Sequence, residues 1–414
     1  MGQAQDRRAF ALEVVERLVE AGHEAVWAGG CVRDLLLGGD RVPDDYDIAT
    51  DAIPERVREI FGRDRTVEVG ASFGVILVRV AGPQPPIEVA TFRTEGAYGD
   101  GRHPDSVQFA SRQEDARRRD FTINGMFMNP QTGEVFDDVG GRRDLEQQVV
   151  RAIGDPESRI NEDKLRMLRA IRFTALLGFT LDPATAAAIG DHAGEISVVS
   201  AERIAEEWRR MLGHKSRAVA VSLAIETGLL ECVFPELPAG ADSVAVSRLQ
   251  RLPESATANV GLALLLVDVA DPRVVCRRLK LSNRECDEVA WLVISRSALD
   301  SAPTQPRSKL FPVLADRSRD GLLELVDAIE RADGRESSEV AWCRGLLETV
   351  SDQELNPQPL VTGDDLQAIG LSPGPLFKTL LDSVRAAQLD REIRNRDEAL
   401  AMVQEINTRQ HNDE

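Results

Sequence analysis

The sequence has 414 residues and lacks both a long apolar run and an apolar segment at its start. No stretch approaches the ~20 consecutive apolar residues that are needed to cross a bilayer. The opening residues, MGQAQDRR, contain no apolar core of the kind that directs secretion. These absences favour a cytoplasmic protein without a membrane partner, and the length is enough for about two to four domains.

Cysteine is scarce and scattered. The five cysteines are Cys31, Cys232, Cys276, Cys286 and Cys343. Because no two of them form a CxxC pair, the spacing indicates neither a zinc site nor a disulfide framework. We expect isolated reduced thiols in packed or half-packed positions.

The chain also lacks the basic surplus that is typical of proteins that coat nucleic acid. With 50 lysines and arginines against 69 acidic residues, its formal net charge is −19. Arginines nevertheless gather at residues 117–119 and again at Arg166, Arg169 and Arg172. An acidic chain with such basic strips should bind RNA at a defined site and in a salt-sensitive way.

Up to about residue 153 the sequence mixes helix and strand patterns. Apolar residues recur at helical spacing over residues 9–22. The short apolar runs typical of strands are 25–28, 46–49, 75–80 and 87–92, with a helical pattern at 32–37. A turn rich in proline and glycine predicts that the last two runs form a hairpin. Residues 93–111 are polar and rich in glycine, so we expect a long loop there.

Beyond residue 155 the pattern is almost wholly helical. One apolar stripe runs from Leu165 to Leu176 and another from Ile204 to Leu212, with Ser200 as a plausible N-cap. The proline-containing stretch 300–307 is a candidate linker. The layout therefore predicts an α+β head followed by helical domains.

Residues 29–34, GGCVRD, stand at a predicted junction between strand and helix. Gly29 and Gly30 would let the backbone approach a phosphate, and the helix start offers unpaired N–H groups and a positive dipole end. The guanidinium of Arg33 could bind a phosphate or a nucleotide hydroxyl. A tight turn with a surface arginine would give the same pattern, so this motif alone decides little.

A second pattern places two carboxylates two residues apart. On a strand, Asp45 and Asp47 would point to one face, with Asp44 facing away. Two close carboxylates need a cation between them, or one must take a proton. Mg²⁺ with a nucleoside triphosphate supplies that cation, and a two-metal arrangement suits in-line phosphoryl transfer. The alternative is a solvated acidic turn after Pro43.

A glycine pair, a short helix and then DxD on a strand together resemble the nucleotidyltransferases of the DNA polymerase β type. Glu88, on a later predicted strand, is a candidate third catalytic carboxylate, as a metal ligand or as the base for the incoming hydroxyl. It could equally be a partnered residue on the polar face of that strand.

Longer runs make the resemblance closer. Residues 29–38 (GGCVRDLLLG) and 45–50 (DYDIAT) are similar to the class II tRNA nucleotidyltransferase (CCA-adding enzyme) and bacterial poly(A) polymerase family. The run RRDFTIN, at 118–124, resembles its second motif, and GGRRDL, at 140–145, its hinge. The run EDKLRMLRAIRF, at 162–173, resembles the helix that selects the base. Order and spacing agree over about the first 240 residues.

The resemblance implies a division of the chain and a set of site residues. The parts that it implies are a polymerase β-like α+β head at 1–153, an all-α neck at 154–215, a body at 216–300 and an RNA-binding tail at 301–414. It implies Mg²⁺ at Asp45 and Asp47, in a two-ion mechanism, with CTP and ATP as substrates. The nucleotide-binding residues that it implies are Gly29, Gly30, Arg33, Arg118, Arg119, Asp120, Asn124, Asp163, Arg166, Arg169 and Arg172.

Asp163 and Arg166 are three residues apart and would share one face of a helix. From the residues alone, an ion pair between them is the simpler interpretation. In the context of the family, the carboxylate accepts from an exocyclic amine and the guanidinium donates to a ring nitrogen or carbonyl. Such a pair admits CTP and ATP and rejects UTP and GTP without a template. Arg169 and Arg172 continue the stripe, as phosphate ligands or as a solvated basic face.

The predicted loop carries side chains of both charges. They include Arg93, Glu95, Asp100, Arg102 and Asp105. In the family, an intact flexible loop of this kind accompanies the addition of the terminal A. Its presence argues against an enzyme that adds only C-C, and it leaves CCA addition and A addition both open.

The sequence departs from the family pattern at a few positions. Asp138 replaces a frequent proline, Ile160 a usual phenylalanine and Lys378 a usual glycine, and none of these bears on the predicted chemistry. Histidine is scarce, with five in the chain and none directly followed by an aspartate. A fused metal phosphohydrolase domain of the kind found in some relatives is therefore not expected.

The resemblance predicts that a tRNA 3′-hydroxyl attacks the α-phosphate of CTP or ATP and that pyrophosphate leaves. The helical remainder would bind the acceptor arm by shape and phosphate contacts, and no obligate protein partner is indicated. A poly(A) polymerase on the same scaffold is the nearest alternative, although such enzymes are usually more basic than a pI of 4.9. A non-catalytic RNA-binding protein would need a broken metal pair. A small-molecule nucleotidyltransferase would not need so long a helical stretch.

Overall fold

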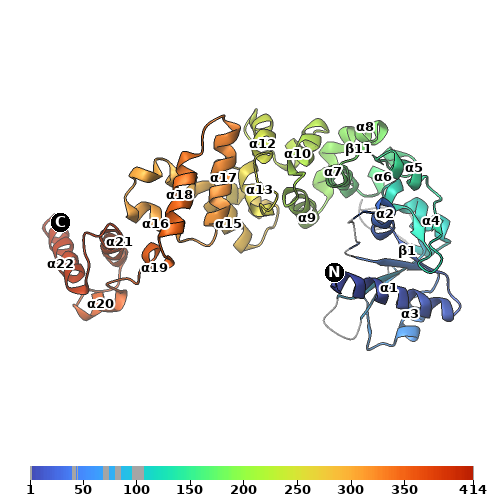
Figure 1. The fold of residues 1–414 in the computed structure, drawn as a ribbon, viewed down its shortest axis with the longest axis horizontal. Coiled ribbons are helices and arrows are strands. Elements are labelled where there is room, and N and C mark those ends of the chain that lie inside the picture. Colours follow the sequence, from blue (N-terminus) through green and yellow to red (C-terminus); the bar gives the residue numbers. More distant parts are fainter. Residues whose placement is uncertain are drawn as a thin grey trace. The chain divides into compact units, whose positions relative to one another are not determined.

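The computed structural model describes residues 2–39, 43, 45–68, 74–79, 85–95 and 107–413. The chain forms two compact units, Met1–Pro235 and Glu236–Glu414. In Figure 1 strands and helices mix in the blue part of the ribbon, and helices dominate from green to red. This arrangement confirms the α+β head and the helical remainder that the sequence predicted.

A seven-stranded sheet organises the head, in the order β3-β4-β5-β2-β1-β8-β9. Its strands are β1 (Ala25–Ala28), β2 (Asp47–Thr50), β3 (Thr66–Glu68), β4 (Val75–Val78), β5 (Ile87–Thr91), β8 (Phe127–Met128) and β9 (Val135–Phe136). Strands β2 and β5 run parallel and the other pairs antiparallel. The pairing of Ile48 with Val89 brings the preceding residues, Asp47 and Glu88, to neighbouring positions. The predicted hairpin is confirmed, because β4 and β5 pair directly.

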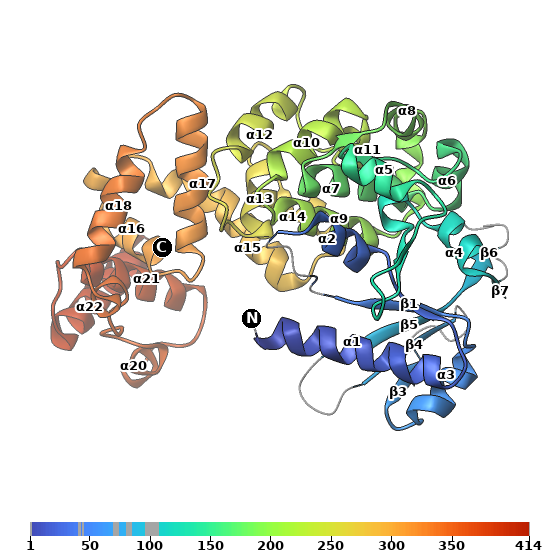
Figure 2. The same ribbon diagram turned by 45° about the vertical axis from the view of Figure 1, so that its right-hand side comes forward.

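Helices α1 (Gly2–Glu20) and α3 (Pro54–Phe61) cover one face of the sheet (Figure 2). Buried residues on the sheet side of α1, Val14 and Leu18 among them, recur at helical spacing and confirm the helix predicted at 9–22. Helix α2 (Gly30–Leu37) follows β1 directly. The other short helices of the head are α4 (Arg112–Arg118), η2 (Thr122–Asn124) and α5 (Gly141–Glu146).

The prediction of one long loop at 93–111 is wrong at both ends. Strands β6 (Arg93–Glu95) and β7 (Val107–Phe109) pair antiparallel there, with Arg93 opposite Phe109. A ladder of this kind is made by backbone groups, so a polar composition does not reveal it. Of the charged residues predicted for this loop, Asp100, Arg102 and Asp105 lie outside the described residues.

The rest of the first unit is helical apart from a short parallel pair, β10 (Val149–Val150) with β11 (Thr180–Leu181). Its helices are α6 (Pro156–Glu162), α7 (Leu165–Leu177), α8 (Pro183–His192), η3 (Ala193–Val198), α9 (Ala201–Leu212), α10 (Arg217–Glu226) and α11 (Leu229–Val233). Asp155 and Asp182 cap α6 and α8, each before a proline in the first turn. Ser200 stands at the start of α9 as predicted, but its side chain makes no capping hydrogen bond.

The second unit consists of helices. They are α12 (Ala241–Leu249), α13 (Ala258–Leu265), α14 (Pro272–Arg278), α15 (Asn283–Ser295), η4 (Arg296–Leu299), η5 (Ala302–Thr304), α16 (Arg307–Leu314), α17 (Arg319–Ala332), α18 (Ser338–Thr349), α19 (Asp352–Leu355), α20 (Gly363–Ala368), α21 (Pro375–Leu389) and α22 (Arg396–Asp413). Leu366, Leu380 and Val403 join α20, α21 and α22 in one apolar cluster. The candidate linker at 300–307 lies inside this unit, with Ala302 buried. Among the described residues, no helix has the length and apolar character needed to cross a membrane.

Two glycines of the first unit should respond in opposite ways to an added methyl group. At Gly141, a Cβ would lie 2.3 Å from the carbonyl oxygen of Thr122 and 2.7 Å from Cγ of Met126. Gly141→Ala should therefore lower the free energy of unfolding by about 1–3 kcal/mol. Gly190 lies within α8, and a Cβ there would meet no atom within 4 Å, so Gly190→Ala should be neutral or raise the free energy of unfolding by up to about 1 kcal/mol. Urea denaturation of both variants measures the difference, and equal effects would contradict this account.

Candidate nucleotide site

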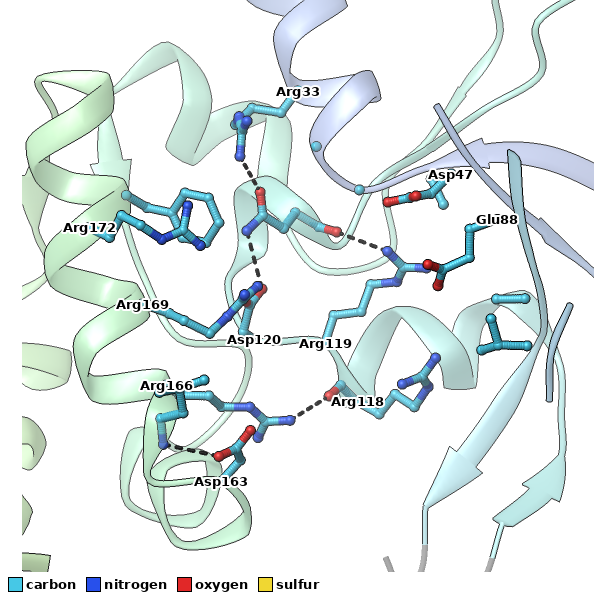
Figure 3. A pocket seen from close by; sticks show the side chains of 18 of the residues that line it. Arg33, Asp47, Glu88, Arg118, Arg119, Asp120, Asp163, Arg166, Arg169 and Arg172 are labelled. Carbon is cyan, nitrogen blue, oxygen red and sulfur yellow. Dashed lines mark hydrogen bonds and ion pairs between the residues drawn. The ribbon is translucent and has the colours of Figure 1, made fainter. Parts of the chain in front are cut away.

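A cavity of about 820 Å³ in the first unit is lined by residues of the sheet, α2, α7 and α9 (Figure 3). Its charged lining residues are Arg33, Arg93, Arg118, Arg119, Arg166, Arg169, Arg172, Arg203 and Arg210 together with Asp47, Glu88, Asp120 and Asp163. Nine arginines thus face four carboxylates in a chain whose net charge is strongly negative. A positive cavity of this kind attracts an anion. It brings together Asp47, Glu88 and all the nucleotide-binding residues that the sequence predicted.

The glycine turn lies where β1 gives way to α2. Gly29 has a φ of 69°, which side chains rarely adopt, and its N–H donates to the carbonyl of Met126 at 3.1 Å. A Cβ at Gly29 would also lie 3.0 Å from Nη1 of Arg119. The turn therefore needs glycine both for its backbone and for the space that this arginine occupies. It opens the first turn of α2 toward the cavity, where free N–H groups bind anions.

A chain of hydrogen bonds connects α2 to α7 through η2 (Figure 3). Arg33 donates through Nη1 to Oδ1 of Asn124 at 2.8 Å, and Nδ2 of Asn124 donates to Oδ1 of Asp120 at 3.2 Å. Arg169, on α7, donates through Nε to Oδ2 of Asp120 at 2.8 Å. Burial alone would raise the pKa of Asp120, but the charge and hydrogen bond of Arg169 outweigh it and lower that pKa to about 2. Asp120 is therefore a fixed anion that orients its neighbours.

The carboxylates of Asp47 and Glu88 lie side by side on β2 and β5, at the edge of the cavity (Figure 3). Burial, followed by the charges of Glu88 and Asp45, raises the pKa of Asp47 to about 7. Burial and the charge of Asp45 also raise the pKa of Glu88, against the opposing charges of Arg93 and Arg119. Carboxylates with raised pKa values at one point favour a cation between them.

Asp45 lies outside the strand on which the sequence placed it, although its charge still acts on Asp47 and Glu88. Strand β2 begins only at Asp47, because Asp45 bends back to accept from the N–H of Tyr46 at 2.9 Å. Asp45 is exposed and pairs with Arg7 of α1, and it is not among the residues that line the cavity. The ring of Tyr46 is buried 4.8 Å from that of Trp27, which fixes the backbone between the two aspartates.

A magnesium site fits these carboxylates only in part. Within the described portion of the chain, no group of three or more histidine, cysteine or acidic side chains is gathered closely enough to hold a metal ion. Mg²⁺ usually takes one or two protein carboxylates and completes its shell with water and substrate phosphates. Asp47 with one neighbouring carboxylate meets that requirement, provided that a triphosphate lies in the cavity.

Asp163 and Arg166 do not share a helix, which corrects the prediction of one continuous helix over 162–173. Helix α6 ends at Glu162, and Asp163 has extended backbone with φ −147° and ψ 105° before α7 begins. The helix is interrupted because Oδ1 of Asp163 accepts from the N–H of Leu165 at 3.0 Å, a local bond that competes with helical pairing. Both side chains still line the same part of the cavity (Figure 3).

Each of these two side chains is held by a different part of the fold. Asp163 accepts from Nη2 of Arg203, on α9, at 2.7 Å. Arg166 pairs with Glu162 and donates through Nη2 to the carbonyl of Arg118 at 3.0 Å. Asp163 and Arg166 thus have separate partners in place of an ion pair with each other, and both residues line the cavity.

Arg172 is a structural residue more than an open phosphate ligand. It is buried and donates through Nε to Glu207, on α9, at 2.6 Å. Its guanidinium also lies 4.2 Å from the ring centroid of Phe173, and those of Arg33 and Arg169 lie 5.3 Å from the same ring. Three arginines of the cavity wall therefore contact one aromatic ring.

Several residues of the site were missed from the sequence. Arg203, Arg210 and Phe173 line the cavity, and Asp115 lies behind it. Asp115 could have been found, because it stands three and four residues before two of the predicted arginines. Arg203 could not have been found, because it lies 40 positions after Asp163, a separation that no local spacing rule covers.

Comparisons with known proteins agree with this geometry. Models of three families match: "Poly A polymerase head domain" over 25–151, "Probable RNA and SrmB- binding site of polymerase A" over 178–239 and "tRNA nucleotidyltransferase domain 2 putative" over 251–403. The CCA-adding enzyme of Geobacillus stearothermophilus is 34% identical over 396 residues, which cover 94% of this chain and 95% of that one. The chain belongs to the family of CCA-adding enzymes.

Other members of the CCA-adding enzyme family support the same assignment. The CCA-adding enzyme of Bacillus subtilis (strain 168) is 46% identical over 229 residues, 55% of each chain. The crystal structure of the Bacillus stearothermophilus CCA-adding enzyme in complex with CTP matches with a TM-score of 0.75 and 31% identity, covering 97% of this chain and 98% of that one. The resemblance drawn from the motifs between residues 29 and 173 is therefore confirmed.

The raised pKa of Asp47 predicts how stability depends on pH. The folded chain holds this proton up to about pH 7, while the unfolded chain releases it near the ordinary value of 3.8, so wild-type stability falls as pH rises between the two. Because asparagine does not ionise, the stability of Asp47→Asn should not fall with pH in this way. Because Asp47 still touches solvent, its advantage should reach only about 1 kcal/mol at high pH.

The measurement is urea denaturation in EDTA at about pH 5 and about pH 8, on either side of the raised pKa. The advantage of Asp47→Asn over the wild type should be larger at the higher pH, because the stability of the wild type falls continuously from the ordinary pKa of 3.8 up to about pH 7. The same difference at both pH values would contradict the assignment of this proton to Asp47.

Proposed function

We propose that this protein adds CMP and AMP from CTP and ATP to the 3′ end of tRNA, without a nucleic-acid template, and releases pyrophosphate. The observation that carries the proposal is that one basic cavity contains Asp47 and Glu88 at one side and Asp163 and Arg166 at the other. Its relatives are named CCA-adding enzymes, and one of them was solved in complex with CTP.

In this proposal Asp45 and Asp47 hold Mg²⁺, and Glu88 is a further ligand or the base for the incoming hydroxyl. The ion would relieve the repulsion that raises the pKa values of Asp47 and Glu88. Bound there with the triphosphate, it would stabilise charge on the attacking and leaving oxygens. Asp45 would have to leave Arg7 to join the site, and it carries the acceptor oxygens to do so.

The triphosphate would lie against the start of α2 and the nearby arginines. The N–H groups after Gly29 and Gly30, with Arg33 and Arg119, offer donors from two sides of the cavity. Asn124 and Asp120 set the orientation of Arg33. The arginines thus bind the phosphates in a fixed arrangement, which positions the α-phosphate for attack.

Asp163 and Arg166 would read the base. C and A each carry an exocyclic amine beside an acceptor ring nitrogen, whereas U and G carry a carbonyl beside a ring N–H. A carboxylate and a guanidinium match the first pattern and oppose the second. Because Arg203 and Glu162 hold the two side chains, they can discriminate without reorganising.

The experiment incubates the protein and Mg²⁺ with tRNAs ending before CCA, after C and after CC, and offers each nucleotide singly. Stepwise extension of all three tRNAs with CTP and then ATP is expected. Asp45→Ala and Asp47→Ala should each abolish incorporation while tRNA binding persists, because both act on the chemical step. Extension of only the CC-ended tRNA would indicate A addition, and long A tails on unstructured RNA would indicate a poly(A) polymerase.

Asp163→Ala should weaken nucleotide choice more than it slows the reaction. Loss of one base-edge contact should reduce the preference for CTP over UTP by roughly tenfold or more. The rates of single-nucleotide incorporation with each triphosphate give this ratio. Asp191→Ala, at an exposed position on α8, is the matched control and should leave it unchanged. An unaltered preference in Asp163→Ala would show that the base is read elsewhere.

A further inference from the structure

Asp115, on α4, is a buried carboxylate behind the cavity wall, with 1% of its surface exposed. Its Oδ1 accepts from Nε of Arg118 at 2.8 Å. Its Oδ2 accepts from Nε of Arg119 at 3.2 Å and from Nη2 at 3.1 Å. Oδ1 also accepts from the backbone N–H of Arg93 at 3.2 Å. One carboxylate thus contacts two cavity arginines and the first residue of β6.

The charge of Asp115 is permanent at neutral pH. Burial alone would raise the pKa of this carboxyl, but Arg119 and Arg118 outweigh it and hold the pKa below its usual range. A buried carboxylate that is ionised and paired in this way does not exchange protons with a substrate. It also does not line the cavity, so any effect on the reaction must pass through its partners.

Those partners reach the centre of the site. The charge of Arg119 opposes the raised pKa values of Asp47 and Glu88, so its guanidinium lies near the carboxylates. The carbonyl of Arg118 accepts from Arg166, which lines the base side of the cavity. An arginine side chain has many rotamers, and ordering it on ligand binding costs conformational entropy. A fixed carboxylate behind the arginine orders the side chain beforehand and so reduces that cost.

We propose that Asp115 is a positioning residue that fixes Arg118 and Arg119 for the β- and γ-phosphates of the incoming nucleotide and ties them to β6. This inference rests on the proposed function, because the two arginines matter in this way only when a nucleoside triphosphate lies in the cavity. Asp115 itself touches neither substrate nor metal.

The test compares the binding of CTP and CMP, with Mg²⁺, to the full-length wild type and to Asp115→Asn. The substitution keeps the shape and removes the charge. Kd for CTP should rise roughly tenfold, since bonds to a charged partner are among the stronger ones. Kd for CMP should change little, because CMP lacks the β- and γ-phosphates. Asp327→Asn, which removes a buried carboxylate paired with Arg331 in the second unit, should leave both values unchanged.

A double-mutant cycle separates positioning from general support of the fold. In the background Arg118→Gln with Arg119→Gln, Asp115→Asn should add no further weakening of CTP binding, because its partners are gone. Equal weakening of CTP and CMP, or a full further loss in that background, would overturn the proposal. If Asp115→Asn does not fold, Asp115→Glu retains the charge and should give a smaller rise in the Kd for CTP alone. Equal effects of Asp115→Glu on CTP and CMP would also overturn the proposal.

Binding is measured separately from turnover so that the two hypotheses can fail separately. A wild type that binds CTP but extends no tRNA would refute the proposed function and leave the comparison of CTP with CMP intact. A wild type that extends tRNA, with an Asp115→Asn variant that binds CTP normally, would refute the role of Asp115 alone.

Discussion

The site depends on the pairing of arginines with carboxylates, because the nine guanidinium groups that line the cavity would otherwise repel one another. Some counter-charges stand in the wall, such as Asp120 against Arg169. Others lie behind it, such as Asp115 and Glu207. The arrangement leaves positive charge facing inward and negative charge behind. An acidic protein can in this way present a basic site without a basic surface.

The parallel pairing of β2 with β5 has the opposite electrostatic effect. It sets Asp47 beside Glu88. Burial with the charges of Glu88 and Asp45 raises the pKa of Asp47, and burial with the charge of Asp45 raises that of Glu88. Hydrophobic residues on the other face of these strands, such as Ile48 and Val89, hold the register in place. Core packing therefore maintains a like-charge contact that a cation would relieve, next to arginines that would bind the anion accompanying that cation.

The sequence predicted those parts of the fold and site whose signals are local. Strand β1, helix α2 and the hairpin β4–β5 follow from periodicity and turn chemistry, and the motif runs carried the resemblance. The errors arose where a side chain or backbone bond competed with the regular pattern. Asp45 and Asp163 each accept from a nearby backbone N–H and so leave the strand and the helix that spacing predicted for them. Contacts such as Arg33 with Asn124, 91 residues apart, have no local signal at all.

In the proposed mechanism, the interruption at Asp163 changes what controls base choice. On one helix, the separation of Asp163 and Arg166 would follow from helical geometry alone, about 1.5 Å of rise per residue. In the fold, α9 holds Asp163 through Arg203, whereas Arg166 is held by Glu162 and the last residue of α4. The spacing of the two side chains is thus set by how α4 and α9 pack around α7. If Asp163 and Arg166 read the base as we propose, selection of a nucleotide without a template depends on tertiary packing, and residues that never contact the base help to determine it.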